Sequence, residues 1–376
     1  MDVLARYAIL GAAGFTFAFG PTWSHLSILL LYPVAANGKK HTPGWVGTFY
    51  ALALIPAATA AWDYAHAIGW LIMAWLIPWL VNTALLSFAL VQKNTAKRIG
   101  FTLVVLVALN VPPLSAISVI SPAPVAGLLF PGFGIAGLAL LAGFIALSLT
   151  LSTLNRVPQL LILGALTLCT ASAYATVSDT PSKDSSLIQA VQTYRGMPSA
   201  IEIQAFHRAW RFDELQLADA SVANTVVFPE STFGDWIDAD ATMLNASKKE
   251  IIGGARIALN ESAYTHVLIS NRRGVVYQQR QPLPVGFGHK RRAVKATNES
   301  NGKPLIDALI CIELANPWIT LSTFIQAEKV VVWAANLGWS TNLRLHQRLE
   351  TNLQQWAQLF GVQAISAVNH RKNTHG

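Results

Sequence analysis

The chain has 376 residues, of which 53% are hydrophobic and only 12% are charged, and its formal net charge is +8. Soluble domains carry about 25% charged residues, so the composition excludes a protein that lies entirely in water. Of the 46 charged residues (27 Lys and Arg plus 19 Asp and Glu), nine precede Ser178 and 37 follow it, which divides the chain into an apolar and a polar half near Asp179.

The apolar half is expected to form a multi-span α-helical membrane domain of about seven helices over residues 1–178. A bilayer core about 30 Å thick needs about 20 helical residues, and seven apolar stretches come near or exceed this length. The first two are short and meet at Gly20–Trp23, so they form either a tight hairpin or a single bent helix; a cleaved signal peptide is the alternative for the first. The stretches are 5–20, 22–36, 45–62, 67–91, 99–120, 124–152 and 159–177.

The loops between these stretches predict the orientation of the chain. With seven spans and a cytoplasmic N-terminus, every Lys and Arg of this half lies on the cytoplasmic side, which is the positive-inside pattern. The loops on the opposite side then contain no Lys or Arg, and their only acidic or imidazole side chains are Asp63 and His66. The polar half follows the seventh span, so we expect a multi-pass protein of the bacterial inner membrane with a periplasmic C-terminal domain. The basic residues are Arg6, Lys39, Lys40, Lys93, Lys97, Arg98 and Arg156.

From about Leu187 onward, the sequence predicts an α/β domain, and the whole polar half extends over residues 179–376. Short β-branched runs alternate with polar or helical segments, as is typical of layered α/β folds. Thr341–Phe360 has apolar residues at helical spacing and ends before a glycine, and Ser270–Tyr277 is expected to be a hairpin. The expected strands are Thr225–Phe228, Ile251–Gly253, Thr265–Ser270, Gly274–Tyr277, Leu305–Ile312, Val330–Ala335 and Val362–Val368.

The polar half contains one basic cluster, His289–Lys295, within the Gly- and Pro-rich segment Pro282–Lys303. Nucleic-acid sites present a basic stripe in a helical or aromatic context, which this segment lacks, so no direct nucleic-acid partner is predicted. The cluster is either a solvated loop or a contact with anionic lipid headgroups, and the whole segment is either a lid at the membrane surface or a disordered loop. Cys169 and Cys311 lie in different halves, so no disulfide between them is expected.

Two strand ends carry groups of complementary chemistry. The apolar run in VVFPESTFGDW (Val226–Trp236) ends with Glu230, and the run PLIDALI ends at Cys311. A thiol with a pKa of about 8.5 is a weak nucleophile at neutral pH until a base takes its proton. Glu230 is therefore a candidate general base and Cys311 a candidate nucleophile. Taken alone, the first is more often a turn residue and the second a small buried hydrophobe.

These motifs resemble the nitrilase superfamily, in which Glu, Lys and Cys act in that chain order. Their order also resembles the apolipoprotein N-acyltransferase family of multi-span membrane proteins, and FPESTFGDW and YQQRQPLPV are still more similar to the TraB-type conjugal transfer proteins. The resemblance implies a nitrilase-like α/β (αββα) sandwich domain and an acyl-thioester on Cys311, with Glu230 as general base. The motifs are FAFGP, VVFPE, VYQQRQPLPVGFG, ALICIE, AANLGWS and ISAVN.

The resemblance is incomplete at the site. The lysine of the family corresponds to Gln279, whose amide still donates a hydrogen bond, and the neighbouring Arg280 is a further candidate for an oxyanion contact. Loss of an oxyanion donor typically costs about a hundredfold to a thousandfold in rate. An acidic residue and a tyrosine of the family correspond to Phe287 and Ile312. The chain is also shorter at its C-terminus than the family, so a sheet edge is expected to be open or covered by a partner.

Four further residues are candidates for substrate binding or for support of the site. Glu313 lies two residues after Cys311 and either orients the site or accepts a hydrogen bond from a backbone amide. Asn336 and Trp339 follow a strand and are candidates to line an acyl pocket, with ordinary packing as the alternative for Trp339. His346 lies off the apolar stripe of its helix, so a surface or supporting position is favoured over catalysis.

Two functions follow from these observations. In the first, the protein is a Cys-dependent acyltransferase or amidase of a conjugal transfer system, acting on a lipid-derived or amide substrate. Its partners are then the bilayer, a phospholipid acyl donor and proteins of the conjugation machinery. In the second, the domain is catalytically degenerate and serves as a structural component of the DNA-transfer apparatus. The enzyme is favoured because Glu230 and Cys311 both stand at strand ends. No cofactor and no metal ion are expected.

Overall fold

The computed structural model describes residues 3–36, 39–152, 188–195, 213–230, 232–236, 244–260, 263–280, 306–340 and 343–371. The chain forms two compact units. One combines Met1–Thr180 with Ala315–Leu321 and Asn342–Gly361, and the other comprises Pro181–Leu314, Ser322–Thr341 and Val362–Gly376. The boundary that the sequence predicts near Asp179 lies outside the described residues.

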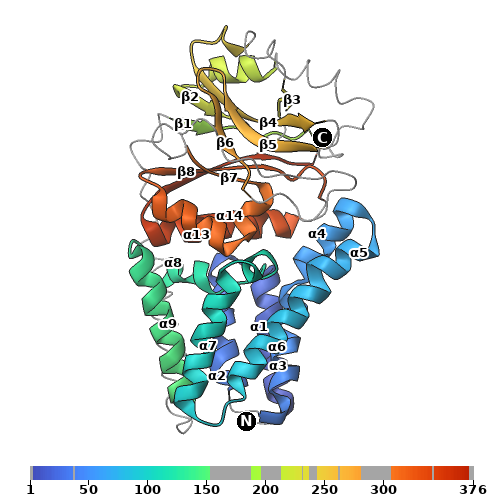
Figure 1. Ribbon diagram of the computed structural model, residues 1–376, viewed down its shortest axis with the longest axis vertical. Helices are drawn as coiled ribbons and strands as arrows, with labels where there is room; N and C mark the ends of the chain where they lie inside the picture. Colours follow the sequence, from blue (N-terminus) through green and yellow to red (C-terminus); the bar gives the residue numbers. More distant parts are fainter. Residues whose placement is uncertain are drawn as a thin grey trace. The chain divides into compact units, whose positions relative to one another are not determined.

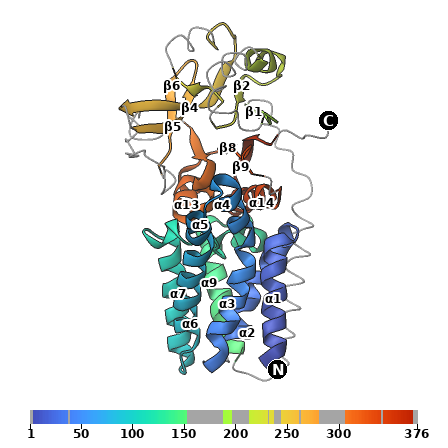
Figure 2. The same ribbon diagram turned by 90° about the vertical axis from the view of Figure 1, so that its right-hand side faces the viewer.

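The first unit is helical. Its longer helices run alongside one another: α1 packs against α3, α3 against α6, α6 against α7 and α7 against α9 (Figure 2). The described helices that contribute to it are α1 (Val3–Phe19), η1 (Thr22–Leu30), α2 (Leu31–Ala35), η2 (Lys39–His41), α3 (Thr42–Ala53), α4 (Ile55–Ala65), α5 (Ile68–Leu71), η3 (Ile72–Leu76), α6 (Ile77–Leu90), α7 (Thr95–Asn110), η4 (Leu114–Ala116), η5 (Ala123–Val125), α8 (Ala126–Leu129), α9 (Gly134–Leu151), the first residues of α13 (Pro317–Gln326), and α14 (Leu343–Phe360).

Within the described residues of this unit, two helical stretches are long and apolar enough to cross a membrane, Ile68–Leu90 and Gly134–Leu151. α3 and α4 pass the same test together but are bent by 46° at their junction, so they form a broken span or a re-entrant loop. Pro56 accounts for the bend, because it has no N–H to donate to the preceding turn. The first two predicted stretches are separate: the first forms α1, and the second forms η1 followed directly by α2. The seventh, 159–177, lies outside the described residues, so the seven-span domain stays a prediction.

α14 packs within the helical unit, although the sequence assigns it to the polar half. Arg348 donates from Nη1 to the carbonyl oxygen of Ala53 (2.8 Å), at the end of α3, and its guanidinium lies 4.4 Å from the ring centre of Phe17. Gly127 of α8 permits a close approach, because a Cβ there would lie 1.8 Å from the carbonyl oxygen of Gln355. α14 is thus held in the unit by two contacts: Arg348 caps the C-terminal end of α3, and the backbone at Gln355 packs closely on Gly127 of α8.

The second unit contains two β-sheets (Figure 1). The first has the strand order β1-β2-β4-β5-β6, with β3 paired to β4, and the second has the order β7-β8-β9 with parallel pairing throughout. The strands are β1 (Ile188–Ala190), β2 (Thr225–Val227), β3 (Gly234–Asp235), β4 (Glu250–Asn260), β5 (Ala263–Ser270), β6 (Gly274–Gln278), β7 (Asp307–Ile310), β8 (Val330–Asn336) and β9 (Gln363–Asn369).

One apolar core lies between the two sheets. Val227 and Ile252 of the first sheet pack with Ile310 and Val332 of the second. A second apolar cluster, on the other face of the first sheet, includes Ala218 from the helical segment 213–220. The described part of this unit therefore has a helix, a sheet and a second sheet in successive layers, which agrees with three layers of the predicted αββα sandwich.

All seven predicted strands are present, and β4 and β7 differ most from the predicted lengths. β4 continues to Asn260, whereas the sequence predicts a strand ending at Gly253. The ring of Phe233 packs on Gly253 within this strand, where a Cβ would lie 2.5 Å from the ring. β7 ends at Ile310, so Cys311 follows the strand instead of lying within it. The predicted hairpin is confirmed, since β5 and β6 pair antiparallel.

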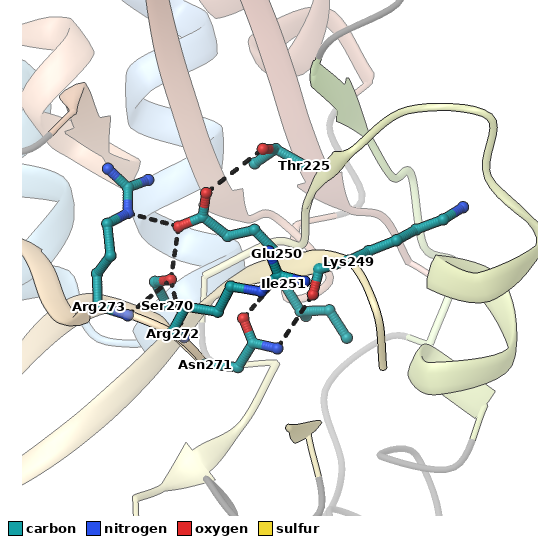
Figure 3. A network of polar contacts seen from close by, with 8 residues as sticks. All are labelled: Thr225, Lys249, Glu250, Ile251, Ser270, Asn271, Arg272 and Arg273. Atoms are coloured by element: carbon teal, nitrogen blue, oxygen red, sulfur yellow. Dashed lines mark hydrogen bonds and ion pairs between the residues drawn. The ribbon is translucent and has the colours of Figure 1, made fainter. Parts of the chain in front are cut away.

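A polar network fastens one end of the first sheet (Figure 3). The carboxylate of Glu250 accepts hydrogen bonds from Ser270 Oγ (2.6 Å) and Arg273 Nε (2.5 Å). Asn271 accepts from the N–H of Ile251 (2.9 Å). These contacts tie the β5–β6 turn to the first residues of β4. Because β2 and β4 are parallel and both begin here, the residues that follow β2 lie at the opposite end of the sheet, away from this network.

Candidate active site

Glu230 and Cys311 follow strands of different sheets and meet in one site. Glu230 lies three residues after the end of β2, and Cys311 directly follows β7. The thiol of Cys311 is hydrogen-bonded to the carboxylate of Glu230, which is buried, with 8% of its surface exposed. The structure therefore brings together the two residues that the sequence suggests as base and nucleophile.

Cys311 has a backbone conformation that is rare for a residue with a side chain. Its φ is 51°, in the left-handed region, where a side chain costs about 1–2 kcal/mol relative to the right-handed region. Trp333 of β8, which is buried, donates from Nε1 to the carbonyl oxygen of Cys311 (3.1 Å) and holds this conformation. Strained residues of this kind cluster at functional sites. Trp333 is not predicted from the sequence, where its only signal is an aromatic residue within an apolar strand.

The surroundings of Cys311 favour the protonated thiol. Burial raises the pKa of the Cys311 thiol well above its usual value, and the charge and hydrogen bond of Glu230 raise it further. The main-chain N–H groups of Asn336 and Ile312 act on this pKa in the opposite direction. A thiolate therefore forms at neutral pH only when a base such as Glu230 takes the proton. N–H groups directed at the sulfur are also the kind of donor that stabilises an oxyanion.

Asn336, at the end of β8, joins the site to the bridge between the sheets. Its N–H donates to Oε2 of Glu230 (3.2 Å), and its side-chain oxygen accepts from Nδ2 of Asn369 (2.9 Å) and from the N–H of Gly338 (3.2 Å). Asn369 also accepts from Thr193 Oγ1 (2.9 Å), and these two residues form a parallel bridge from one sheet to the other. The side chain of Asn336 thus shapes the turn after β8, whereas its main chain contacts the site.

Glu313 is fully buried and connects β6 with the segment after β7. Its carboxylate accepts hydrogen bonds from the hydroxyl of Tyr277 (2.7 Å), the N–H of Ile310 (2.8 Å) and the N–H of Arg280. It therefore satisfies backbone amides and at the same time orients the chain next to Cys311, which combines the two roles considered from the sequence.

The guanidinium of Arg280 donates hydrogen bonds to three side-chain hydroxyl groups. Nε donates to the hydroxyl of Tyr277 (3.0 Å), Nη1 donates to Ser322 Oγ (3.2 Å), and Nη2 donates to Thr323 Oγ1. The same group lies 5.6 Å from the ring centre of Tyr277. The structure thus gives Arg280 a set of structural contacts, and the oxyanion contact considered from the sequence stays a prediction.

His266 of β5 contacts the candidate base, a contact that is not predicted from the sequence. Its Nδ1 lies 3.3 Å from Oε1 of Glu230. Gln279, which follows β6, lies opposite His266, because its N–H donates to the carbonyl oxygen of His266 (2.9 Å). Opposed residues project from the same face of a sheet, so the two side chains lie on one face. Gln279 is 5% exposed, and its side-chain amide makes no hydrogen bond within the part of the chain that the structure describes. The signal in the sequence was a histidine within an apolar strand.

The burial of two remaining candidates, Trp339 and His346, is described, and the others lie outside the described residues. Trp339 is partly buried in the loop after β8. His346 is buried in α14, with 7% exposed, and belongs to the helical unit, so the surface position considered from the sequence is wrong: the helix buries this face as well as its apolar stripe. Phe287 and the segments Pro282–Lys303 and His289–Lys295 lie outside the described residues. Within the described ranges, no three His, Cys, Asp or Glu side chains gather to hold a metal ion.

Solved structures of an amidase of the nitrilase superfamily and of a carbon-nitrogen hydrolase are similar to part of the chain. An amidase from a Nesterenkonia species shares 13% identity, covers 51% of this chain and 79% of its own, and gives a TM-score of 0.35. A carbon-nitrogen hydrolase from Helicobacter pylori also shares 13% identity, covers 48% of this chain and 72% of its own, and gives a TM-score of 0.35. TM-scores this low transfer nothing about function to this chain.

The curated relatives are conjugal transfer proteins. Conjugal transfer protein TraB of Agrobacterium fabrum is 24% identical over 285 residues, which are 70% of this chain and 65% of that protein. The "Probable conjugal transfer protein TraB" of Sinorhizobium fredii is 25% identical over 283 residues, 70% of each chain. This chain thus spans 65% to 70% of the length of these relatives. No family model matches the chain. The resemblance to TraB-type proteins, predicted from the motifs, is confirmed by these relatives.

Proposed function

We propose that this chain is a membrane-bound nitrilase-like protein of a conjugal transfer system that forms an acyl-thioester on Cys311. The observation that carries the proposal is the hydrogen bond between the Cys311 thiol and the buried carboxylate of Glu230. The similarity to TraB proteins supports the connection with conjugal transfer, and the two long apolar helices support membrane association. An inner-membrane location with a cytoplasmic N-terminus and a periplasmic C-terminal domain belongs to the same proposal and is supported by the distribution of basic residues.

The proposed reaction has two steps. In the first, Glu230 takes the thiol proton, and the sulfur of Cys311 attacks the carbonyl carbon of an ester or amide. The N–H of Ile312, which is directed at the sulfur, donates to the oxyanion, whereas the N–H of Asn336 is shared with the carboxylate of Glu230. The C–O or C–N bond then breaks, and Glu230 gives its proton to the leaving alkoxide or amine. In the second step an amine or water attacks the thioester, its proton passes to Glu230, and the departing sulfur recovers that proton as a thiol.

A lipid-derived acyl donor, a phospholipid in particular, is the substrate class that we favour. Lipid esters are available to a protein with membrane-spanning helices, and the reaction needs only a carbonyl with a leaving group. The bilayer and proteins of the conjugation machinery are the proposed partners, and no direct contact with nucleic acid is proposed.

The test is the intact mass of the purified protein after incubation with phospholipid vesicles. We expect an acyl adduct that is absent in Cys311→Ala and strongly reduced in Glu230→Gln, because the thiol then has no base. Cys169→Ala removes the other cysteine and is the matched control, in which the adduct persists. Absence of any adduct on the wild-type protein, together with full plasmid transfer by a strain carrying Cys311→Ala, would overturn the proposal.

One observation favours a second function. Gln279 is uncharged and stands at the position that corresponds to the lysine of the family, as expected of a degenerate site. The domain would then be a structural component of the DNA-transfer apparatus. Glu230→Gln and Cys311→Ala would leave plasmid transfer unchanged, whereas deletion of residues 179–376 would abolish it. Gln279→Lys separates the two functions: a gain of acyl-adduct formation or hydrolysis supports a competent site, and continued inactivity supports the structural function.

A further inference from the structure

The candidate site holds a buried negative charge. Before the proton moves, the charge is on Glu230; afterwards it is on the sulfur of Cys311. A charge taken out of water is costly unless an opposite charge or several hydrogen bonds compensate it. Gln279 contributes no charge, and the guanidinium of Arg280 is bound to Tyr277 and to two hydroxyl groups.

His266 is placed to compensate this charge. Its Nδ1 is 3.3 Å from Glu230 Oε1, and the two side chains are 13% and 9% exposed, so water screens the contact only weakly. β5 lies between β4 and β6 in the sheet, and His266 pairs with Arg256 on one side and bonds to Gln279 on the other. The backbone that presents the imidazole is therefore fixed from both sides.

The groups that face His266 decide its charge. Glu230, from the loop after β2, favours the protonated imidazole, because it is in direct contact. Arg256, opposite on β4, disfavours it, and Gln279 is neutral. The N–H of Asn336, from β8, donates to the other oxygen of the same carboxylate. Of these groups, Glu230 is in direct contact with the imidazole, 3.3 Å from Nδ1, where a Coulomb interaction is strong.

We propose that His266 is the positioning residue of this site: it holds Glu230 against Cys311 and, when protonated, supplies the positive charge that Gln279 lacks. The inference rests on the proposed function, because both treat Cys311 as the nucleophile. The proton balance is simple. The thiol proton moves to Glu230, His266 keeps both ring protons, and the site then holds a thiolate and an imidazolium with no change in its net charge.

The test measures the rate of alkylation of Cys311 by iodoacetamide between pH 5 and pH 10, in the full chain carrying Cys169→Ala. The thiolate reacts and the thiol does not, so the rate reports the thiolate fraction. We expect a plateau near neutral pH, from the thiolate–imidazolium form, before the alkaline rise in which the thiol ionises directly. His266→Gln is expected to lose the plateau and to react about tenfold more slowly at pH 7, as for the loss of one neighbouring charge.

Two further variants separate a charge effect from a structural one. His266→Lys keeps a positive charge and is expected to restore the plateau and extend it to higher pH, because a lysine holds its proton longer than a histidine. His370→Gln is the matched control, because it makes the same chemical change at a histidine outside the site. The side chain of His370 hydrogen-bonds to Gln192 (2.9 Å) in an exposed contact. It is expected to leave the profile unchanged. Near-UV circular dichroism checks that each variant is folded.

Loss of the plateau in His266→Gln with recovery in His266→Lys supports the proposal. An unchanged profile in His266→Gln, an equal loss in both variants, or a wild-type profile without a plateau overturns it. The acyl-adduct experiment is independent of these results. An adduct with an unaffected His266→Gln profile leaves the proposed function standing and removes the role of His266. Absence of an adduct with loss of the plateau removes the proposed function and keeps the role of His266.

Discussion

The main-chain N–H of Asn336 lies 3.2 Å from Oε2 of Glu230, so the end of β8 in one sheet is fastened to the carboxylate that follows β2 in the other. His266 contacts the second oxygen of the same carboxylate from β5. The candidate base is therefore held between the two sheets, and the residues that hold its two oxygens are expected to control activation of the thiol.

Asn369→Ala tests the support behind Asn336. The change removes the amide that donates to Asn336 and the oxygen that accepts from Thr193 and from the N–H of Arg195. Leaving such buried groups unpaired costs about 1–3 kcal/mol, so we expect that loss in the free energy of urea unfolding and slower alkylation of Cys311. Gln192→Ala is the control: Gln192 precedes Thr193, and its exposed amide donates to the carbonyl oxygen of Ser366. It is expected to change stability by less than about 0.5 kcal/mol. Wild-type values for both properties in Asn369→Ala would contradict this account.

Glu313→Gln tests the buried carboxylate that orients the segment after Cys311. An amide keeps the shape but places an NH₂ group against the N–H of either Ile310 or Arg280, both of which donate to Glu313 now. We expect the unfolding free energy to fall by about 3 kcal/mol, because hydrogen bonds to a buried charge are lost. Glu328→Gln makes the same chemical change at an exposed residue and is expected to be nearly neutral. Equal losses in the two variants would show that Glu313 has no special role.

The raised pKa of Cys311 predicts a loss of stability at alkaline pH. In the unfolded chain the thiol ionises near its ordinary pKa of about 8.5, whereas burial and Glu230 keep it protonated in the folded state to a much higher pH. The stabilising contribution is therefore complete below about pH 8 and is lost as the pH rises toward the folded pKa, by up to about 1.4 kcal/mol per pH unit. Urea unfolding at pH 7.5 and 9.5 measures this, and Cys311→Ala is expected to lack that part of the decrease. Parallel curves for the two proteins would contradict it.

Arg348→Ala tests the cap that α14 places on α3. Burial lowers the pKa of Arg348 to about 10, so the guanidinium is still charged at neutral pH when it donates to Ala53 and packs on Phe17. Loss of a charged hydrogen bond and of a cation–π contact is expected to lower stability by about 2 kcal/mol. Arg344→Ala, at an exposed position of the same helix, is the matched control and is expected to be nearly neutral. A thermal shift of equal size in both variants would rule out the cap.

The sequence predicts the parts of the site that depend on local pattern. Glu230 and Cys311 are recognisable because each ends an apolar run, and α14 because its apolar residues have helical spacing. His266 and Trp333 were missed because their roles depend on strand register and on contacts between distant segments, which no local pattern encodes. Two hydrogen-bond partners of Arg280, Ser322 and Thr323, lie more than 40 residues further along the chain. The sequence therefore could not predict these contacts either.

Gly127→Ala and Gly143→Ala make the same change at two sites of the helical unit, and the structure predicts effects of opposite sign. At Gly127 of α8 a new Cβ would lie 1.8 Å from the carbonyl oxygen of Gln355, a backbone atom that moves only if α14 moves. We expect a loss of about 3 kcal/mol from overpacking. At Gly143 of α9 nothing lies within 4 Å, so alanine is expected to stabilise the helix by up to about 1 kcal/mol. Thermal unfolding in detergent measures both, and a neutral Gly127→Ala would mean that α14 does not pack closely against α8.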